Sequence, residues 1–529
     1  MAALSRALRA SQFRCVTLRE MEYIKQRYAA ILSSTGVILC LAGLLMLLPL
    51  LILFAYPRES TIAWFFLVPA VVIGVLGLFT WWAFRPSRTV TLSIHEGGVI
   101  VLISWSTVIL FSALPFLSLR GMDLSRAVFE SMSGWTTTGL SVVDVSKASR
   151  MVLMWRSLMQ LAGGAGLAII MMSAITGPVG IGISSAEGRS DQLVPHVHRS
   201  ARLVLIIYTT YAVIGTFAYL MAGMSPFDAI NHSFAAVSTG GFSTHVESIG
   251  YWDSAAIEAV TVLLMLLGNL NFVTAWFLWR GKLRVAARSG EVRLLAVLVP
   301  LAATLVFLLT CRMVYPHLGK SVRVAVFDTV SAITTTGFST ISCGEWNDFG
   351  RIILVVLMLI GGGTCSTAGG IKQSRVYLLW KLLVWEIKRA FMARTTVMAN
   401  SVWEGNRRVF IADAKIRPVF IFVFLYLAIY LIGTMILCAC GYSLDNSLFE
   451  FSSALGTVGL SVGVTSADMS NPVLWTQIFA MFLGRLEFFV VIVSLLKLGR
   501  DGYRIINSIG KKENTLRKWG CRGIDSPGK

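Results

Sequence analysis

The segment Thr335-Thr336-Gly337-Phe338-Ser339 has three close copies elsewhere in the chain. All four share the pattern T-x-G-[FL]-S, and average residue frequencies predict well under ~0.1 such match in a chain of 529 residues. Internal repetition of this kind indicates a structure assembled from similar units. The other copies are Thr137-Thr138-Gly139-Leu140-Ser141, Thr239-Gly240-Gly241-Phe242-Ser243 and Thr457-Val458-Gly459-Leu460-Ser461.

The chain around these copies has the composition of a membrane protein. Hydrophobic residues make up 56% of it and charged residues only 14%, whereas soluble domains are about a quarter charged. A soluble protein this apolar would expose large hydrophobic patches. Ten apolar runs approach the length of about 20 residues that a membrane-spanning helix needs. They lie near 31–55, 62–84, 98–117, 151–175, 201–222, 255–279, 294–314, 351–379, 418–440 and 473–496.

Each copy of the motif lies between two of the last eight runs. The copies occupy weakly apolar stretches at 123–143, 225–245, 322–342 and 444–464, which are too short to span as helix plus loop. Irregular backbone is tolerated at membrane depth only where it lines a watery cavity or is buried in protein. The sequence therefore predicts an all-α polytopic membrane protein, with two N-terminal helices followed by four span–pore-loop–span repeats around a central cation pore.

The residue types in these loops suit the coordination of a monovalent cation. Rings of backbone carbonyls replace the water shell of potassium in a narrow pore, and glycine adopts the unusual backbone angles that this takes. Small residues also let membrane helices pack, but that alternative does not explain a fourfold motif between spans. The paired glycines of the second loop leave its register open by one residue. We predict a selectivity filter formed by Thr137, Thr138, Gly139, Thr239, Gly240, Gly241, Thr335, Thr336, Gly337, Thr457, Val458 and Gly459.

Ionisable residues recur at a fixed distance from the filter glycines. Glu130, His232, Asp328 and Glu450 each stand nine residues before the glycine of their repeat. Ionisable groups inside a membrane need partners, so we expect these four to support the filter from behind rather than to bind ions. The alternative is that they lie near a helix terminus and face solvent.

A second predicted element lies below the filter. The eighth apolar run is interrupted at 361–370 by small residues that cannot hold a rigid helix. The tenth run contains Arg485, and a buried arginine is costly and usually functional. We predict that this loop and Arg485 form a gate, and we group Glu487 with the filter-supporting residues. A structural Arg485–Glu487 ion pair is the alternative. The loop residues assigned to the gate are Gly361, Gly362, Gly363, Thr364, Ser366, Thr367, Gly369 and Gly370.

The net charge of +19 indicates an orientation in the membrane. With the N-terminus inside, the inward segments carry 34 of the 46 Lys and Arg residues, as the positive-inside rule expects. Both termini are therefore predicted to be cytosolic. The charge requires no nucleic acid, and clusters such as Lys388-Arg389 are suited to anionic lipid. The inward segments are 1–30, 85–97, 176–200, 280–293, 372–417 and 497–529.

The outward side is more acidic than the inward side. A negative vestibule would concentrate cations there, and ordinary solvated loop charge is the alternative. The acidic residues in or near the outward loops are Glu130, Asp144, Glu247, Asp253, Glu345, Asp348 and Asp468.

These motifs resemble the Trk/Ktr/HKT superfamily of potassium transporters, most closely its bacterial TrkH branch. The likeness covers roughly residues 31–500 and rests on the four loops, the segment STAGGIKQSR from Ser366 to Arg375 and the segment GRLEFF from Gly484 to Phe489. It implies potassium as the transported ion, with no organic cofactor in this chain. It also implies a homodimer with one pore per subunit, a location in the bacterial inner membrane, and a cytosolic nucleotide-binding regulatory subunit of the TrkA type.

The expected function is potassium uptake across the plasma membrane through a channel-like pore. Proton- or sodium-coupled symport on the same scaffold is the alternative. A membrane-embedded enzyme is disfavoured, because the chain has no HExxH motif and no intramembrane pair of Asp residues. The expected division is a cytosolic segment 1–30, two extra helices in 31–97, repeats at 98–200, 201–293, 294–417 and 418–497, and a cytosolic basic tail 498–529.

Overall fold

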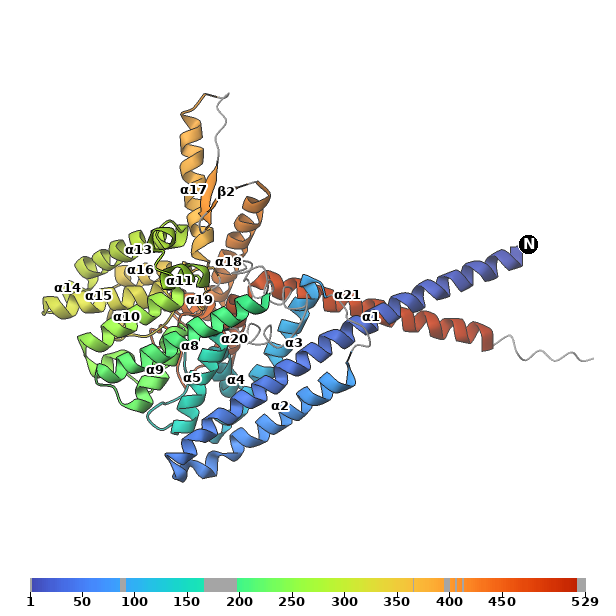
Figure 1. The fold of residues 1–529 in the computed structure, drawn as a ribbon, viewed down its shortest axis with the longest axis horizontal. Coiled ribbons are helices and arrows are strands. Elements are labelled where there is room, and N and C mark those ends of the chain that lie inside the picture. The colour runs from blue at the N-terminus through green and yellow to red at the C-terminus, as the bar shows by residue number, and fades with distance from the viewer. Residues whose placement is uncertain are drawn as a thin grey trace, which may run out of the picture.

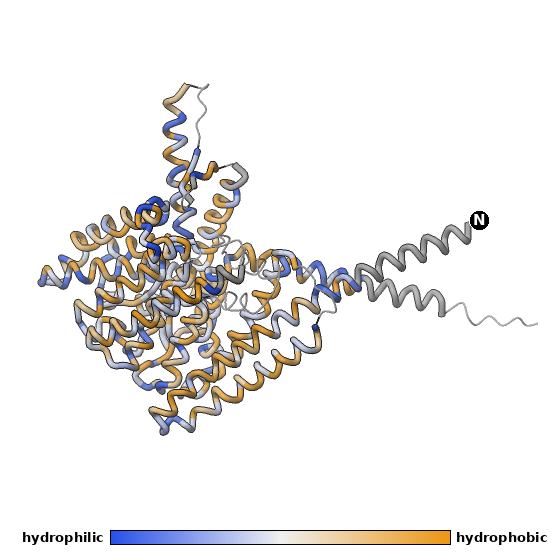
Figure 2. Tube along the Cα trace, viewed as in Figure 1, coloured by the Kyte–Doolittle hydropathy of each residue, from blue (hydrophilic) through white to orange (hydrophobic). Residues whose placement is uncertain are grey.

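The structure is a computed structural model that describes residues 2–85, 92–165, 197–364, 366–393, 400–404, 407–411 and 413–520. The described residues form a bundle of helices with one small two-stranded hairpin, as Figure 1 shows. Figure 2 shows that apolar residues dominate the helices of the bundle. The predicted class of an all-α membrane protein is confirmed.

Two N-terminal helices lie side by side along one edge of the bundle (Figure 1). They are α1 (Ala2–Leu47) and α2 (Trp64–Ala83), joined by 3-10 turns at Leu48–Phe54 and Pro57–Ile62. A Cβ added to Gly36 would lie only 2.6 Å from the carbonyl oxygen of Gly77. Small residues at such a crossing let membrane helices approach closely.

Four groups of helices follow, and in each a short helix stands between two others. The short helices α4, α9, α15 and α19 have 12, 12, 16 and 13 residues. A helix of that length measures about 18–24 Å, less than the hydrocarbon thickness of about 30 Å. The groups are α3 (Ile94–Ala113), α4 (Leu124–Trp135), α5 (Arg150–Ala165); α8 (Val197–Met221), α9 (Pro226–Val237), α10 (Ala255–Asn269); α13 (Gly290–Val306), α15 (Leu318–Ile333), α16 (Asp348–Leu359); and α18 (Asp413–Ala439), α19 (Leu444–Gly456), α20 (Asn471–Leu486).

The remaining elements extend or connect these groups. The strand hairpin and α17 (Gln373–Ala390) project together from the bundle (Figure 1). Short 3-10 turns lie at Leu114–Ser118, Ser248–Trp252 and Cys343–Glu345, and a π-helical turn lies at Phe307–Cys311. The helices are α11 (Phe272–Trp279), α12 (Leu283–Ala286), α14 (Arg312–Val314), α17 (Gln373–Ala390) and α21 (Phe488–Gly520), and the antiparallel strands are β1 (Ser401–Glu404) and β2 (Arg407–Phe410).

Among the described residues, six helices are long and apolar enough to cross a membrane, or eight if each of two bent pairs is one span. These coincide with eight of the ten expected runs. Of the other two, 151–175 continues beyond the described residues. The second of these two runs, 351–379, is divided by an irregular segment between α16 and α17.

The two bent pairs correct the prediction of continuous spans at 255–279 and 473–496. Helices α10 and α11 meet at 116°, and α20 and α21 meet at 98°. At the first bend Leu270 is extended, and the Asn271 side chain caps α11 by accepting the N–H of Val273 at 2.8 Å. At the second bend Glu487 has a left-handed φ of 54°. Hydropathy records apolar character but not backbone direction, which explains the error.

Candidate functional site

The four short helices end in the same way. The first threonine of each motif copy has a φ between 51° and 54°, and the next N–H donates to the carbonyl five residues back. Examples are Thr138 to Ser133 at 2.9 Å and Val458 to Ser453 at 2.8 Å. This left-handed helix cap usually takes glycine, and a β-branched residue is strained there. Strain repeated at four equivalent positions is typical of a functional site.

The last glycine of each motif copy lies against a neighbouring loop. Its φ is positive, from 74° to 104°, and an added Cβ would lie 2.0–2.3 Å from a carbonyl oxygen of that loop. Glycine is therefore required at these positions both by backbone angle and by space. The contacts run from Gly139 to Gly240, from Gly241 to Thr336, from Gly337 to Val458 and from Gly459 to Thr138.

These contacts close a ring, because each loop touches the next and the fourth touches the first. They also align Gly241, not Gly240, with the glycines of the other loops. The C-terminal ends of the four short helices converge on this ring. Each helix end carries partial negative charge, and the backbone oxygens of the loops add more. The ring is therefore electrostatically suited to a cation that has shed water.

The four residues predicted behind the loops are all fully buried. Each hydrogen-bonds residues just after the motif glycine of its own repeat. Such contacts satisfy the buried polar groups and fix the exit of each loop. Glu130 accepts the N–H of Val142 at 3.0 Å, Asp328 that of Thr340 at 3.3 Å and Glu450 that of Val462 at 3.2 Å, while His232 Nε2 lies 2.9 Å from Ser243 Oγ.

Glu487 lies apart from those four residues. Its two carboxylate oxygens accept hydrogen bonds from Arg375 Nη2, each at 3.0 Å. The guanidinium of Arg375 also lies over the ring of Phe422 at 3.8 Å. The structure therefore places Glu487 at the bend between α20 and α21 and contradicts the alternative of an Arg485–Glu487 ion pair.

Arg156 of α5 is a residue that the sequence interpretation missed. Its side chain is 3% exposed, and its Nε donates to Glu130 Oε1 at 2.7 Å. Its Nη2 donates to Ser141 Oγ at 2.9 Å, and its guanidinium lies over the ring of Phe242 at 3.9 Å. It therefore joins the first and second loops. A single arginine in an apolar run was the available signal.

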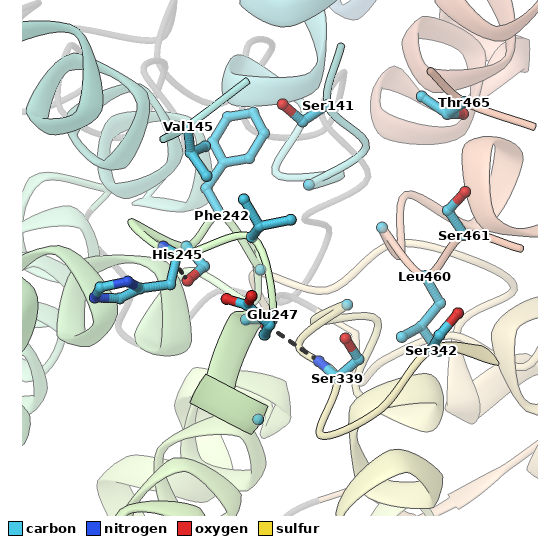
Figure 3. A pocket seen from close by; sticks show the side chains of 18 of the residues that line it. Ser141, Val145, Phe242, His245, Glu247, Ser339, Ser342, Leu460, Ser461 and Thr465 are labelled. Atoms are coloured by element: carbon cyan, nitrogen blue, oxygen red, sulfur yellow. Dashed lines mark hydrogen bonds between the residues drawn. The ribbon is translucent and has the colours of Figure 1, made fainter. Parts of the chain in front are cut away.

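A cavity of about 890 Å³ opens on one side of the ring. The glycines of all four motif copies and the residues after them line it. Figure 3 shows Ser141, Phe242, Ser339 and Ser461, one from each loop, around this cavity. The cavity is the geometric counterpart of the predicted vestibule.

The acidic residues of this side divide into two groups. Asp144, Glu247 and Glu345 line the cavity. Lys147 donates to Asp144 at 2.6 Å and lowers the pKa of that carboxyl to about 2. Outside the cavity lining, Asp253 pairs with Lys320 and Arg323, and Glu130 pairs with Arg156. Paired cations therefore offset part of the predicted negative charge.

On the opposite side of the ring lies the predicted gate segment, whose residue 365 is outside the described residues. Its ends pair through Gly361 N–H to Ile371 O and Gly362 N–H to Gly369 O, both at 3.0 Å. Its far end reaches the first threonines of the second and third motif copies. Thr367 Oγ1 lies 3.0 Å from Thr239 Oγ1, and Gly369 N–H donates to Thr335 Oγ1 at 2.9 Å. The segment thus covers the threonine end of the ring.

Basic side chains hold this segment. Arg485 Nη1 donates to the carbonyl of Thr367, and Nη2 donates to that of Gly163 at 2.6 Å. Lys372, which the sequence interpretation did not single out, donates to the carbonyl of Ala368 at 2.7 Å. The predicted proximity of Arg485 and the loop is therefore observed.

The α10–α11 bend also holds the segment. Gly363 N–H donates to the carbonyl of Asn269 at 3.2 Å. Beside the bend, Thr364 N–H donates to Glu291 Oε1 in the first turn of α13 at 2.8 Å. A helix end leaves backbone carbonyls without helical partners, and the bend makes one of them available here. The asparagines within this apolar run were the sequence signal for this contact with the gate segment.

Comparison with known proteins places this architecture in a family. The TrkH family model, described as a cation transport protein, matches residues 69–502. The chain is 30% identical over 483 residues to the Trk system potassium uptake protein TrkH of Escherichia coli K12, across 88% of this chain and 98% of that protein. It is 28% identical over 477 residues to the uncharacterized cation transporter MJ1485 of Methanocaldococcus jannaschii, across 89% and 95% of the two chains.

A solved structure has the same fold. The crystal structure of the potassium transporter TrkH from Vibrio parahaemolyticus aligns with a TM-score of 0.77 and 28% sequence identity. The alignment covers 88% of this chain and 98% of that one. The family match extends over the helices that build the ring, the cavity and the segment below it. The chain therefore belongs to the TrkH family of cation transport proteins.

Proposed function

We propose that this protein takes up potassium across the plasma membrane, the inner membrane of a bacterium, through a channel-like pore whose selectivity filter is the ring of four loops. The closed cycle of glycine–carbonyl contacts is the observation that carries the proposal. It supports the proposal because backbone oxygens of four loops gather in one ring, beside a cavity and between converging helix ends. Curated relatives named as potassium uptake proteins support potassium as the ion.

The four loops, with their flanking helices, correspond to repeats at 98–200, 201–293, 294–417 and 418–497. The segment 361–370 and Arg485 act as the gate, supported by their contacts with the threonine end of the ring. Glu130, His232, Asp328 and Glu450 stabilise the loop exits. Substitution of these four is expected to act on filter geometry, because none of them lines the cavity.

Coupling is tested by measuring rubidium influx into proteoliposomes with the membrane potential clamped. A channel-like pore is expected to show an influx that changes less than about twofold when a pH or sodium gradient is imposed, because the ion follows its own gradient. A proton symporter would instead accumulate up to about tenfold more rubidium per pH unit, which is worth about 1.4 kcal/mol. Accumulation driven by either gradient would replace the channel with the symporter.

Orientation is tested with single cysteines in a background from which the native cysteines have been removed. An impermeant maleimide is expected to label Ser60→Cys in intact cells and Lys388→Cys only after permeabilisation. Both positions are exposed, so the side of the membrane decides the labelling. The physical basis is the excess of Lys and Arg on the inward segments. Labelling of Lys388→Cys from outside would reverse the proposed topology, in which both termini are cytosolic.

The proposed assembly is a homodimer with a cytosolic nucleotide-binding regulatory subunit of the TrkA type. Both parts rest on the family resemblance. The projecting α17 and its hairpin offer a basic surface on the proposed cytosolic side. Its last turn contains Lys388 and Arg389, and Arg408 lies over Trp403 in the hairpin.

A further inference from the structure

The second loop of the ring lacks a side chain that the other three have. Ser133, Ser331 and Ser453 each stand six residues before the motif glycine of their repeat, whereas the second repeat has Ala235. The other hydroxyls bond their own loops. Ser133 Oγ accepts the N–H of Gly139 and Ser453 Oγ that of Gly459, both at 3.0 Å, and Ser331 Oγ donates to Phe338 O at 2.6 Å.

The residue behind this loop also differs from its three counterparts. His232 stands where the other repeats have a carboxylate, and its contact with the loop exit is the single approach to Ser243 Oγ. The other His232 ring nitrogen faces the carbonyl of Asp228 at 2.9 Å, within its own helix. The second loop therefore lacks two kinds of contact that position the other three loops, one from the serine hydroxyl and one from the carboxylate.

Gln160 of α5, in the first repeat, supplies contacts to this loop from outside. Its amide oxygen accepts the N–H of Phe242 at 3.2 Å, and its amide nitrogen donates to the carbonyl of Gly240 at 2.5 Å. Gln160 is fully buried. The Gly240 carbonyl is the one that lies against Gly139 in the ring. A buried amide that satisfies both a donor and an acceptor fixes both atoms strongly.

This contact also explains why the second loop has two consecutive glycines. A Cβ on Gly240 would lie 2.4–2.8 Å from the amide atoms of Gln160. The φ of Gly240 is not in the left-handed region that Gly241 occupies. The first glycine therefore makes room for the glutamine, whereas the second serves the ring. The other loops have Thr138, Thr336 and Val458 at the position of Gly240.

Arg156, one helical turn before Gln160, reaches the same loop. Its Nη1 donates to the carbonyl of Ser243 at 3.1 Å. Residues four apart lie on one face of a helix, so α5 presents both side chains to the segment 240–243.

We propose that Gln160 is a positioning residue that holds the second filter loop from the neighbouring repeat, in place of the missing serine, and thereby helps set ion selectivity. The inference rests on the proposed function of the ring as a filter. Without the Gln160 amide, the Gly240 carbonyl and the Phe242 N–H lose their hydrogen-bond partner. The second loop, which forms one quarter of the ring, is then free to shift.

The test compares rubidium and sodium uptake per folded molecule by full-length Gln160→Met and wild-type protein in proteoliposomes. Methionine keeps the length of the side chain and removes both hydrogen bonds. We expect the rubidium-to-sodium ratio to fall about tenfold, equivalent to about 1.4 kcal/mol. We expect Gln160→Met combined with Ala235→Ser to recover part of the ratio, because the serine gives the loop the hydroxyl of its neighbours.

The matched control is Gln477→Met, which removes a fully buried glutamine that bonds Thr465 Oγ1 at 3.1 Å in the fourth repeat. It is expected to keep the ratio within about twofold. An unchanged ratio in Gln160→Met, an equal fall in both glutamine variants, or no recovery with Ala235→Ser overturns the inference. If Gln160→Met does not fold, Gln160→Asn replaces it, because the shorter amide cannot span both partners.

Glycine variants separate this inference from the filter assignment itself. If Gly241→Ser and Gly337→Ser keep wild-type selectivity, the ring is not the filter and both proposals fail. If those glycine variants lose selectivity while Gln160→Met keeps it, the filter stands and the role of Gln160 is overturned.

Discussion

Gly337→Ser and Gly241→Ser are expected to lower the rubidium-to-sodium uptake ratio by about tenfold or more. An added Cβ would lie 2.0 Å from Val458 O in the first variant and 2.1 Å from Thr336 O in the second. Both glycines also have positive φ, of 85° and 74°. The neighbouring carbonyl must move to make room for the Cβ. Every change of about 1.4 kcal/mol in the relative affinity for the two ions changes the uptake ratio tenfold. Serine therefore disturbs two loops at once.

The measurement is uptake of rubidium and sodium in cells that lack other potassium systems, normalised to folded protein. Gly223→Ser is the matched control, because Gly223 has a φ of 100° but nothing within 4 Å of an added Cβ. It carries the same backbone strain without the collision, and its ratio should stay at the wild-type value. Wild-type selectivity in both filter variants would disprove the filter assignment.

Arg485→Ala is expected to raise potassium flux per molecule by about tenfold while selectivity persists. Removing the guanidinium releases the Thr367 carbonyl of the gate segment and the Gly163 carbonyl. It also removes a positive charge beside the proposed permeation path. Two unit charges 4 Å apart repel each other by about 4 kcal/mol at an effective dielectric constant of 20. Lowering the barrier to the cation by about a third of this energy accounts for a tenfold rise in flux. The filter loops are untouched.

The structure provides the control for this experiment. Glu487 keeps Arg375 as its partner when Arg485 is removed, so Arg485→Ala should yield folded protein. Arg375→Ala strands Glu487 and should lower the amount of folded protein, with flux per molecule unchanged. Expression and flux are measured together in proteoliposomes. Well-expressed Arg485→Ala with unchanged or reduced flux would refute the gate.

Deleting residues 362–368 removes the gate segment by another route and should have the same effect as Arg485→Ala. The ends to be joined already touch, since a Cβ on Gly361 would lie 1.8 Å from Gly369 O. The deletion also frees the hydroxyl of Thr239 from Thr367. A deleted protein that folds but conducts no more than wild type would contradict the assignment.

Much of the fold was predictable, because the bilayer imposes local rules. Helix-length apolar runs gave spans such as 62–84 and 418–440, which the structure has as α2 and α18. The bends at Leu270 and Glu487 were not predictable in this way, because each depends on backbone angles and caps inside a run whose hydropathy stays high. Asn271 turns the chain there with a cap that hydropathy does not register.

The same distinction between local sequence and tertiary structure applies to the candidate site. Sequence alone determined the T-x-G motif, the ionisable residues nine positions before its glycine and the small-residue segment, because each is a local requirement of backbone angle or charge. Tertiary structure decided the partners. Arg485 and Glu487 are two residues apart, yet side chains so spaced do not face each other on a helix, and the bend between them sends one to Thr367 and the other to Arg375. The alignment of Gly241 with the other filter glycines, and the amide of Gln160 behind Gly240, arise from contacts between segments some 80 or more residues apart. Such contacts exist only when the four loops close into a ring, and no single stretch of sequence records that closure.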